Sequence, residues 1–372
     1  MWLIAAALGA LTVANGLLSP SGAFDVLTRT GPVLVFLIAI TVLAELADKA
    51  GVFDHAAHRA ARLARGRTLR LFALVVLIAS ATTILLSLDT TAVLITPVVL
   101  TLAQQLELQP LPFAMATVWL ANTASLLLPV SNLTNLLAVS RLDPSTTSYV
   151  RLLAVPALIA IAVTVAVLLV WHRRALTGGY DVPDAPRPDD RVLLSGTAAA
   201  CLLLVPMLLA GAAVAIASSI AAGLAVALFL WRRPTALRPA LLPWRLVLLV
   251  TGLFLVVTAA GPHGTDDLLR HDVGGPLRAP FVAAGGANVI NNLPAYLAVE
   301  RVVPPHQLLA VLLGVNLGPL VTPWASLATL LWAERCRAKG LRISWLRYAA
   351  AGLVLVPLLL LSTVPFLAPP PS

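Results

Sequence analysis

Apolar runs of about 20 residues recur along the whole of this 372-residue chain, and an α-helix of that length crosses the hydrocarbon core of a bilayer. Charged residues make up only 11% of the chain, against roughly 25% in soluble domains, and the mean hydropathy is +0.94. A membrane β-barrel would show shorter segments of alternating polarity. The sequence therefore predicts an all-α polytopic membrane protein.

The apolar runs divide into nine expected crossings and two expected re-entrant hairpins. The chain opens on an apolar run without a positive leading region, so we interpret it as a membrane helix rather than a signal peptide. The hairpins are expected at about 71–106 and 280–303, because polar residues interrupt both runs at their middle and such backbone must be satisfied by protein or a water-filled cavity. The crossings are expected at about 1–19, 31–52, 111–139, 149–171, 192–211, 212–231, 244–261, 305–333 and 345–367.

Four connecting segments are rich in arginine, at 59–70, 172–191, 232–245 and 334–347. With nine crossings and two hairpins that return to their own side, all four lie on one side, which the positive-inside rule makes the cytoplasm. The N-terminus is then cytoplasmic and the C-terminus external. This topology accounts for the net charge of +9, so the charge does not indicate nucleic-acid binding.

Two polar stretches of the chain match without a gap: "NTASLLLPVSNLTNL" (122–136) and "NLGPLVTPWASLATL" (316–330). Both fit N-x6-P-x2-[NS]-L-x-[NT]-L, and each follows an expected hairpin. The match predicts two inverted-topology repeats that each contain a hairpin and a broken helix, as in secondary transporters whose broken helices build the site. The repeats are expected at 1–171 and 212–372, joined by a cytoplasmic linker and connecting helix at 172–211.

The amides and hydroxyls of the first stretch surround Pro129. We expect the helix to unwind there, so that a polar ligand or ion replaces the missing backbone partners. The alternative is a proline kink whose freed carbonyls are capped by Ser131 and Thr134, with the asparagines bonded to neighbouring helices.

Four polar segments resemble those of the arsenite/antimonite efflux permeases of the ion transporter superfamily: "LDTTAVLITPVVL" (88–100), "ANTASLLLPVSNLTNLLA" (121–138), "NVINNLPAYL" (288–297) and "LGPLVTPWASLATLLW" (317–332). The stretch at 44–66 is also similar to their first basic loop. The resemblance implies export of trivalent arsenic or antimony, with proton coupling or a soluble ATPase as partner. This chain has Leu88–Asp89 where the family often has an Asn-Asp pair, and it is compact for the family.

The resemblance also implies a set of site residues. Those that would bind substrate are Thr90, Thr91, Asn122, Ser131, Asn132, Asn135, Asn288, Asn291, Asn292, Asn316, Thr322, Ser326 and Thr329. Asp89 is the one carboxylate expected deep in the membrane, where an acid is costly and marks a functional position by default. It is the expected proton-coupling residue, and the alternative is a cap on the hairpin tip. Glu45, Glu300 and Glu334 are expected at the membrane interface.

The chemistry of these residues suits arsenite, which near neutral pH is mostly an uncharged trihydroxide. Amides offer it both donors and acceptors. The four segments contain no Lys or Arg, which disfavours a di- or tricarboxylate held through cations, although helix N-termini alone can bind anions.

Other functions remain open at this point. A sodium/proton antiporter or sodium-coupled anion carrier could use the same scaffold, because a fold does not fix a substrate. An enzyme is disfavoured by the lack of HExxH, GxSxG and GxxxxGK[ST] motifs, and a plain membrane anchor would leave the repeated polar breaks unexplained. No cofactor or metal site is expected. Cys201 and Cys336 lack the spacing of a metal or redox motif, and the six histidines fall in loops or at helix ends.

Overall fold

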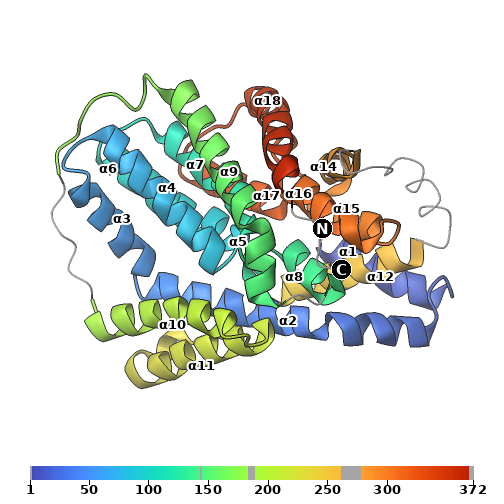
Figure 1. The fold of residues 1–372 in the computed structure, drawn as a ribbon. Helices are drawn as coiled ribbons and strands as arrows, with labels where there is room; N and C mark the ends of the chain where they lie inside the picture. Colours follow the sequence, from blue (N-terminus) through green and yellow to red (C-terminus); the bar gives the residue numbers. More distant parts are fainter. Residues whose placement is uncertain (1, 143–144, 183–188, 261–277, 368–372) are drawn as a thin grey trace.

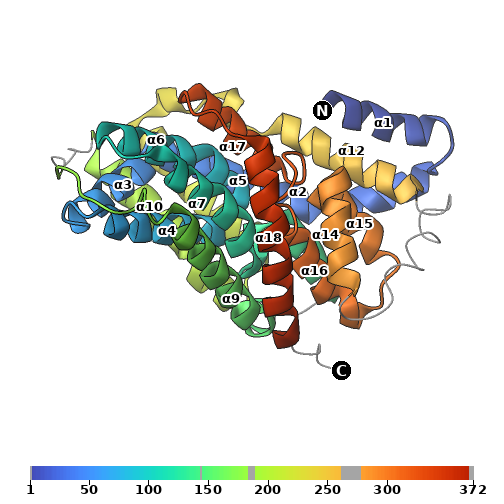
Figure 2. The ribbon, with the colours of Figure 1, turned by 90° about the horizontal axis from the view of Figure 1, so that it is seen from above.

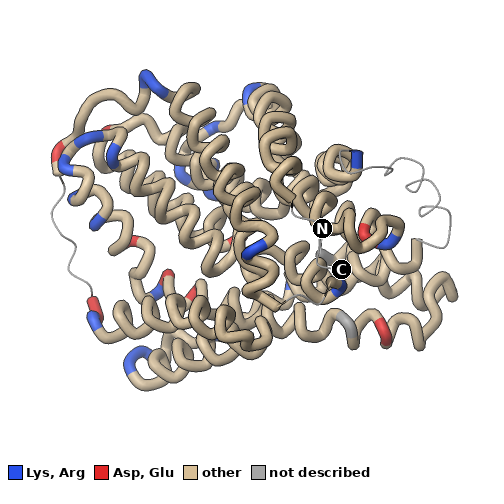
Figure 3. Tube along the Cα trace, in the orientation of Figure 1, with Lys and Arg blue, Asp and Glu red and all other residues tan. Residues whose placement is uncertain are grey.

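The computed structural model describes residues 2–142, 145–182, 189–260 and 278–367, and over these ranges the chain is helical, with no strand (Figure 1). Charged positions gather at helix ends and loops and leave long stretches without charge (Figure 3). The expected all-α polytopic fold is confirmed. Seven of the described helical segments are long and apolar enough to cross a membrane: Thr30–Lys49, Thr68–Leu85, Thr146–His172, Arg191–Leu209, Val214–Arg232, Pro239–Ala260 and Trp345–Phe366.

The first half of the chain follows the expected order of helix, helix, hairpin, broken helix and helix. Its elements are α1 (Trp2–Ala14), α2 (Pro20–Lys49), α3 (Val52–Leu63), α4 (Thr68–Leu85), α5 (Leu88–Thr90), the π-helical η1 (Thr91–Ile95), α6 (Thr96–Gln105), α7 (Pro110–Thr123), η2 (Ala124–Leu126), η3 (Pro129–Ser131), α8 (Leu133–Leu142) and α9 (Thr146–His172).

The second half repeats this order after the connecting helix α10. Its elements are α10 (Arg191–Leu209), α11 (Val214–Arg232), η4 (Pro234–Ala236), η5 (Pro239–Leu241), α12 (Trp244–Ala260), α14 (Arg278–Ile290), α15 (Asn292–Glu300), η7 (Pro305–Gln307), α16 (Leu308–Leu317), α17 (Leu327–Ala338), α18 (Trp345–Thr363) and η8 (Val364–Phe366). Most of the expected external loop 262–280 lies outside the described residues.

Several elements differ from the expectation. Helix α1 has 13 residues and is not among the seven segments, although a crossing was expected at 1–19, whereas Thr68–Leu85, expected as one leg of the first hairpin, is among them. Helix α2 begins eleven residues before the expected position 31, because Ser19 caps it by accepting a hydrogen bond from the Gly22 amide at 3.0 Å and Pro20 fits the first helical position. Helix α3 occupies part of what was expected to be the first basic loop. It forms because small and aromatic residues recur at helical spacing and are buried on one face: Phe53, Ala57, Ala60 and Ala61.

Helix contacts pair the two halves in a regular way. The counterparts in the two halves are α1 and α11, α2 and α12, α4 and α14, α7 and α16, and α9 and α18. Helix α1 packs on α12, and α11 packs on α2. Helix α4 packs on α7, α14 packs on α16, and α9 packs on α18. In Figure 1 α2, α10 and α11 run along the lower edge, while Figure 2 shows α18 between the α4–α7 region and the α14–α15 hairpin. If each helix is replaced by its counterpart in the other half, this set of contacts stays the same.

The four arginine-rich segments lie on one side of the molecule. The Tyr180 hydroxyl donates to the Ala61 carbonyl at 2.6 Å, which joins the first segment to the second. Gln104, at the end of α6, donates to the Lys339 carbonyl at 2.9 Å. Helix α3 packs against both α4 and α6, so both legs of the first hairpin return to this side.

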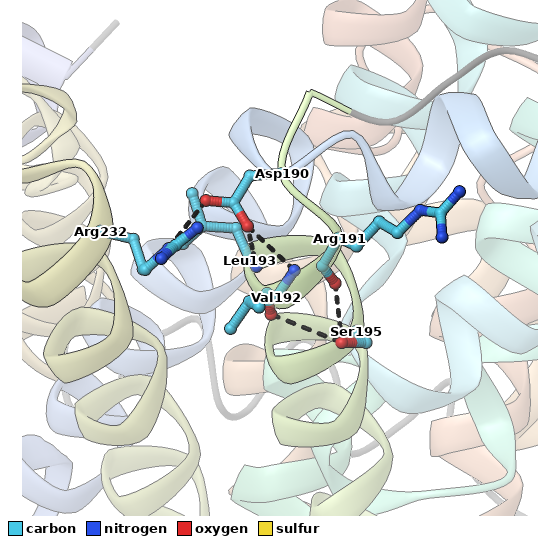
Figure 4. Close-up of polar contacts among 6 residues, drawn as sticks. All are labelled: Asp190, Arg191, Val192, Leu193, Ser195 and Arg232. Atoms are coloured by element: carbon cyan, nitrogen blue, oxygen red, sulfur yellow. Dashed lines mark hydrogen bonds and ion pairs between the residues drawn. The ribbon is translucent and has the colours of Figure 1, made fainter.

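Asp190 caps α10 and also links the second arginine-rich segment to the third (Figure 4). One carboxylate oxygen accepts hydrogen bonds from the amides of Val192 at 2.9 Å and Leu193 at 3.1 Å, and the other accepts from Arg232 Nε at 2.9 Å. The hydrogen bond from Arg232, with those of the two amides, lowers the pKa of Asp190.

This cap predicts a pH-dependent contribution to stability. The pKa of Asp190 is lower in the folded chain, so its stabilisation is complete above the unfolded value of about 3.9 and is lost as pH falls through the folded pKa. We expect Asp190→Ala to lower the unfolding temperature in detergent at pH 7, and the gap to wild type to narrow below about pH 4. A gap that stays constant down to acid pH would contradict this origin.

Gly352 allows α18 to pack closely against the backbone of the second break. A Cβ atom on Gly352 of α18 would collide with the backbone carbonyl of Leu320. We expect Gly352→Leu to cost about 1–3 kcal/mol of stability or more through overpacking, measured as a lower unfolding temperature in detergent. Gly223→Leu in α11 is the matched control, because a Cβ there meets nothing within 4 Å. Equal effects at the two positions would show that close approach is not what Gly352 provides.

Candidate functional site

A central cavity of about 630 Å³ lies among the two hairpin tips, both broken helices and helices α1, α2 and α12. Most of its wall is apolar. The residues of its wall with polar side chains, taken from the described part of the chain, are Thr41, Glu45, Ser87, Asp89, Thr90, Asn132, Asn291, Asn292 and Trp324.

The first hairpin turns at Ser87. Its hydroxyl oxygen accepts a hydrogen bond from the Thr90 amide at 3.1 Å, so Ser87 rather than Asp89 caps the helix that follows. Asp89 lines the cavity, and its Oδ1 is buried with no hydrogen-bond partner among the described residues. A π-helical segment follows at η1, a distortion that is frequent at functional sites. The alternative of Asp89 as a simple cap is thus not what the geometry favours.

The first broken helix stops at Thr123 and resumes at Leu133. Between them, the Ser131 hydroxyl donates to the Ile84 carbonyl at 2.9 Å, which ties the break to the first hairpin. Asn132 adopts an extended conformation (φ −152°, ψ 143°), and its Oδ1 accepts from the Thr134 amide at 3.3 Å. The polar side chains of this break are therefore largely used in holding the unwound backbone.

The second broken helix repeats this geometry at the matched positions. It stops at Leu317 and resumes at Leu327. Ser326, which the sequence match aligns with Asn132, has nearly the same backbone angles (φ −140°, ψ 143°) and caps α17 by accepting from the Thr329 amide at 3.4 Å. The two motifs thus encode the same local structure.

Asn288 ties the second hairpin to the second break. Its Nδ2 donates to the Gly318 carbonyl at 2.8 Å, and its Oδ1 accepts from the amide of Thr322 at 3.0 Å. Its own carbonyl accepts from the Thr322 hydroxyl at 2.9 Å and from Trp324 Nε1 at 2.8 Å. Asn288 and Thr322 therefore act as structural connectors.

The second hairpin turns at Asn291, whose φ of +98° is rare for a residue other than glycine. Its Nδ2 donates to the Trp324 carbonyl at 2.9 Å, and the next amide, of Asn292, donates to the Ala325 carbonyl at 2.8 Å. Strained backbone of this kind persists where the surroundings over-determine it. The turn is thus held open toward the cavity by contacts with the break.

Asn316 locks the two halves together. Its Oδ1 accepts from Asn132 Nδ2 at 2.7 Å and from the Thr134 hydroxyl at 2.8 Å, while its Nδ2 donates to Asn135 Oδ1 at 2.7 Å. Asn135 in turn donates to the Ser125 carbonyl at 2.6 Å. Asn316 is 1% exposed and Asn135 is fully buried, so both amides are engaged by protein.

The implied site residues therefore separate into two groups. Five line the cavity: Asp89, Thr90, Asn132, Asn291 and Asn292. The others lie behind it, where they hold the hairpins and breaks together or are buried between helices: Thr91, Asn122, Ser131, Asn135, Asn288, Asn316, Thr322, Ser326 and Thr329.

Four polar cavity residues are not among the implied site residues: Thr41, Glu45, Ser87 and Trp324. The Thr41 hydroxyl donates to the Leu37 carbonyl within α2 at 2.7 Å. Glu45, which was expected at the membrane interface, lines the cavity from α2. The available signal was that it is a single acid within the apolar run that precedes Asp48. Ser87 opens the helical segment after the hairpin turn, as capping preference predicts. Trp324 follows Pro323 within the second motif and gave no separate signal.

The cysteines do not contribute to this cavity. Cys201 and Cys336 are both buried and free, and neither belongs to the described residues that line it. Among the described residues, no group of three or more His, Cys, Asp or Glu side chains could hold a metal ion.

A helical membrane fold with re-entrant hairpins, broken helices and a cavity between them defines a membrane transporter. The citrate transporter family model matches residues 1–304, so the chain belongs to that family. The arsenical pump membrane proteins of Yersinia enterocolitica and Escherichia coli K12 are 29% and 28% identical to it, each over 89% of this chain and 84% of their own length. A putative arsenical pump membrane protein of Bacillus subtilis is 24% identical over 97% of this chain and 92% of its own.

These relatives confirm the resemblance to arsenical efflux permeases, so the chain is a transporter related to them. The fold is also similar to the crystal structure of the YdaH transporter from Alcanivorax borkumensis. The TM-score is 0.62 at 15% identity, over 94% of this chain and 89% of that one. This likeness concerns the fold alone.

Proposed function

We propose that this chain exports arsenite and antimonite across the cytoplasmic membrane of a bacterium in exchange for protons. The observation that carries the proposal is the lining of the central cavity, which combines hydroxyls, amides and two carboxylates with no Lys or Arg from the described residues. An uncharged trihydroxide offers donors and acceptors that such a lining can match. The naming of the relatives as arsenical pump membrane proteins supports the same cargo.

A tricarboxylate fits this cavity poorly, although the family model is described as a citrate transporter. Glu45 and Asp89 line the wall, and like charges repel strongly where water is scarce. The N-termini of three half-helices border the cavity through Leu133, Leu293 and Leu327. Their partial positive charge favours the oxygen atoms of a small hydroxylated solute.

Asp89 is the residue that we assign to proton coupling. An acid deep in a membrane protein is costly and marks a functional position, and the unbonded Oδ1 leaves this carboxyl free to exchange a proton. Thr90, Asn132, Asn291 and Asn292 are assigned to the substrate, because they share the cavity with Asp89.

The inverted repeats are part of the proposal, with boundaries at 1–171 and 212–372 and the linker 172–211 between them. Two observations support them: the contacts that an exchange of halves leaves unchanged, and the equal backbone of Asn132 and Ser326. The basic segments are assigned to the cytoplasm by the positive-inside rule, which makes the N-terminus cytoplasmic and the C-terminus external.

The test is arsenite and antimonite accumulation in everted membrane vesicles energised by respiration. We expect accumulation that collapses when a protonophore is added, and none in vesicles without the protein. A verified proton gradient that drives no accumulation would contradict proton antiport.

Two further arms of the experiment separate the other mechanisms. Uptake that requires a sodium gradient, or sodium/proton exchange without arsenite, would instead identify a sodium-coupled carrier on this scaffold. Accumulation that appears only when ATP and a soluble arsenite-stimulated ATPase are supplied would identify a partner-driven pump, for which the basic segments are the available docking side.

A further inference from the structure

The central cavity contains a second acid besides Asp89. Glu45, on α2, and Asp89, at the first hairpin tip, are the two ionisable side chains that line it among the described residues. Helices α3, α8, α10, α11 and α12 pack on α2, and none of them contributes a charged side chain to this cavity. The same holds for α4, α7, η1 and α17, which pack on α5. The two acids therefore face a shared apolar space.

A second pocket of about 380 Å³, the outer pocket, lies at the end of α2, on the side of the arginine-rich segments. Asp48 lines it, one helical turn beyond Glu45, and residues three apart on a helix lie on the same face. Asp48 and Glu45 interact electrostatically. The face of α2 that carries both acids thus runs from the outer pocket to the central cavity.

The outer pocket gathers acidic side chains and histidines. Helix α3 contributes Asp54, His55 and His58, and the α10 side contributes Asp189 and Asp190. The cations that face these acids are Lys49 and Arg233 at the pocket, Arg232 bonded to Asp190, and Arg335 of α17 near Asp48. Asp48 thus lies among other polar and charged side chains at the outer pocket.

We propose that Asp48 and Glu45 form the proton route between the outer pocket and Asp89. At each step a protonated carboxyl gives its O–H proton to a carboxylate or to intervening water and becomes a carboxylate itself, so the route consumes nothing else. Water in the central cavity needs polar partners, and besides the two acids the hydroxyls of Thr41, Ser87 and Thr90 line the wall. The proposal rests on the proton antiport proposed above.

The experiment uses purified full-length protein in liposomes and two assays with radiolabelled arsenite. The first is uptake driven by an imposed pH gradient. The second is counterflow of labelled against unlabelled arsenite at equal pH, which needs substrate binding and movement but no net proton transfer. The variants are Glu45→Gln, Asp48→Asn and the conservative Glu45→Asp. Asp25→Asn is the matched control, because Asp25 is an exposed acid in the same helix and lines neither space.

We expect Glu45→Gln and Asp48→Asn to slow gradient-driven uptake by about tenfold or more, as the loss of a positioned proton-transfer group does, while counterflow stays at the wild-type rate. Glu45→Asp should recover part of the driven uptake, and Asp25→Asn should match wild type in both assays. Wild-type driven uptake in either Glu45→Gln or Asp48→Asn overturns the proposal, as does a parallel loss of counterflow, which would make the residue part of binding or folding.

Failure of the proposed function has a different signature. Wild-type protein that performs arsenite counterflow but ignores the pH gradient excludes proton antiport, and the proton route falls with it. Wild-type protein that performs neither excludes arsenite as the cargo.

Discussion

Asp89→Asn is expected to abolish gradient-driven arsenite accumulation in everted vesicles, with a loss of about a hundredfold or more if it removes an essential proton carrier. Asparagine has nearly the same size and keeps one acceptor oxygen, but it cannot exchange a proton. The side chain faces the central cavity and its Oδ1 has no hydrogen-bond partner in the described chain, so the substitution leaves the neighbouring bonds intact.

Two comparisons make this result specific. Asp89→Glu keeps a titratable group and should restore part of the accumulation, whereas Asp25→Asn, at an exposed acid on α2, should behave as wild type. Full accumulation by Asp89→Asn would remove Asp89 from the coupling mechanism. Loss of arsenite counterflow as well as accumulation would instead make Asp89 a substrate ligand.

Asn316→Ala is expected to be the most destabilising of the single substitutions in the repeated motifs. It leaves three buried groups without their partner: Asn132 Nδ2, the Thr134 hydroxyl and Asn135 Oδ1. A buried polar group that loses its hydrogen bond costs about 1–3 kcal/mol, so a loss of about 3 kcal/mol or more is expected. The measurement is thermal or denaturant unfolding in detergent.

The repeat supplies the control for this prediction. Asn122 occupies the matched position, but its Nδ2 donates only within its own helix, to Val118 at 3.0 Å, and its Oδ1 is buried without a partner among the described residues. Asn122→Ala should therefore cost much less. Equal destabilisation by the two substitutions would contradict the claim that the hydrogen bonds of Asn316 between the two halves stabilise the fold.

The sequence predicted local structure well where the chemistry is local. Pro129 and Pro323, with capping residues three positions later, predicted where each helix breaks and resumes, and the structure has both breaks at matched positions. Polar residues at the middle of apolar runs predicted both hairpins, since an unwound backbone needs nearby polar partners.

The sequence could not separate binding residues from structural ones. An asparagine has the same donors and acceptors whether it meets a ligand or a protein group, and the partners of Asn316 lie 181 to 184 residues away along the chain. Glu45 shows a related limit of sequence reasoning: its position near a helix end fits an interfacial acid, and only the packing of α2 against the other helices brings it to the cavity wall. The inverted orientation of the repeats and the sidedness of the membrane stay predictions.

The central claim is that a trivalent metalloid occupies the space between the hairpin tips and the first break. The most direct measurement is the anomalous diffraction of antimony in crystals of the wild-type protein grown with antimonite. We expect a peak in the central cavity, beside Asn132, Asn291 and Asn292, which line it with Asp89. A peak at Cys201 or Cys336, or in the outer pocket at Asp48, with an empty central cavity, would contradict it.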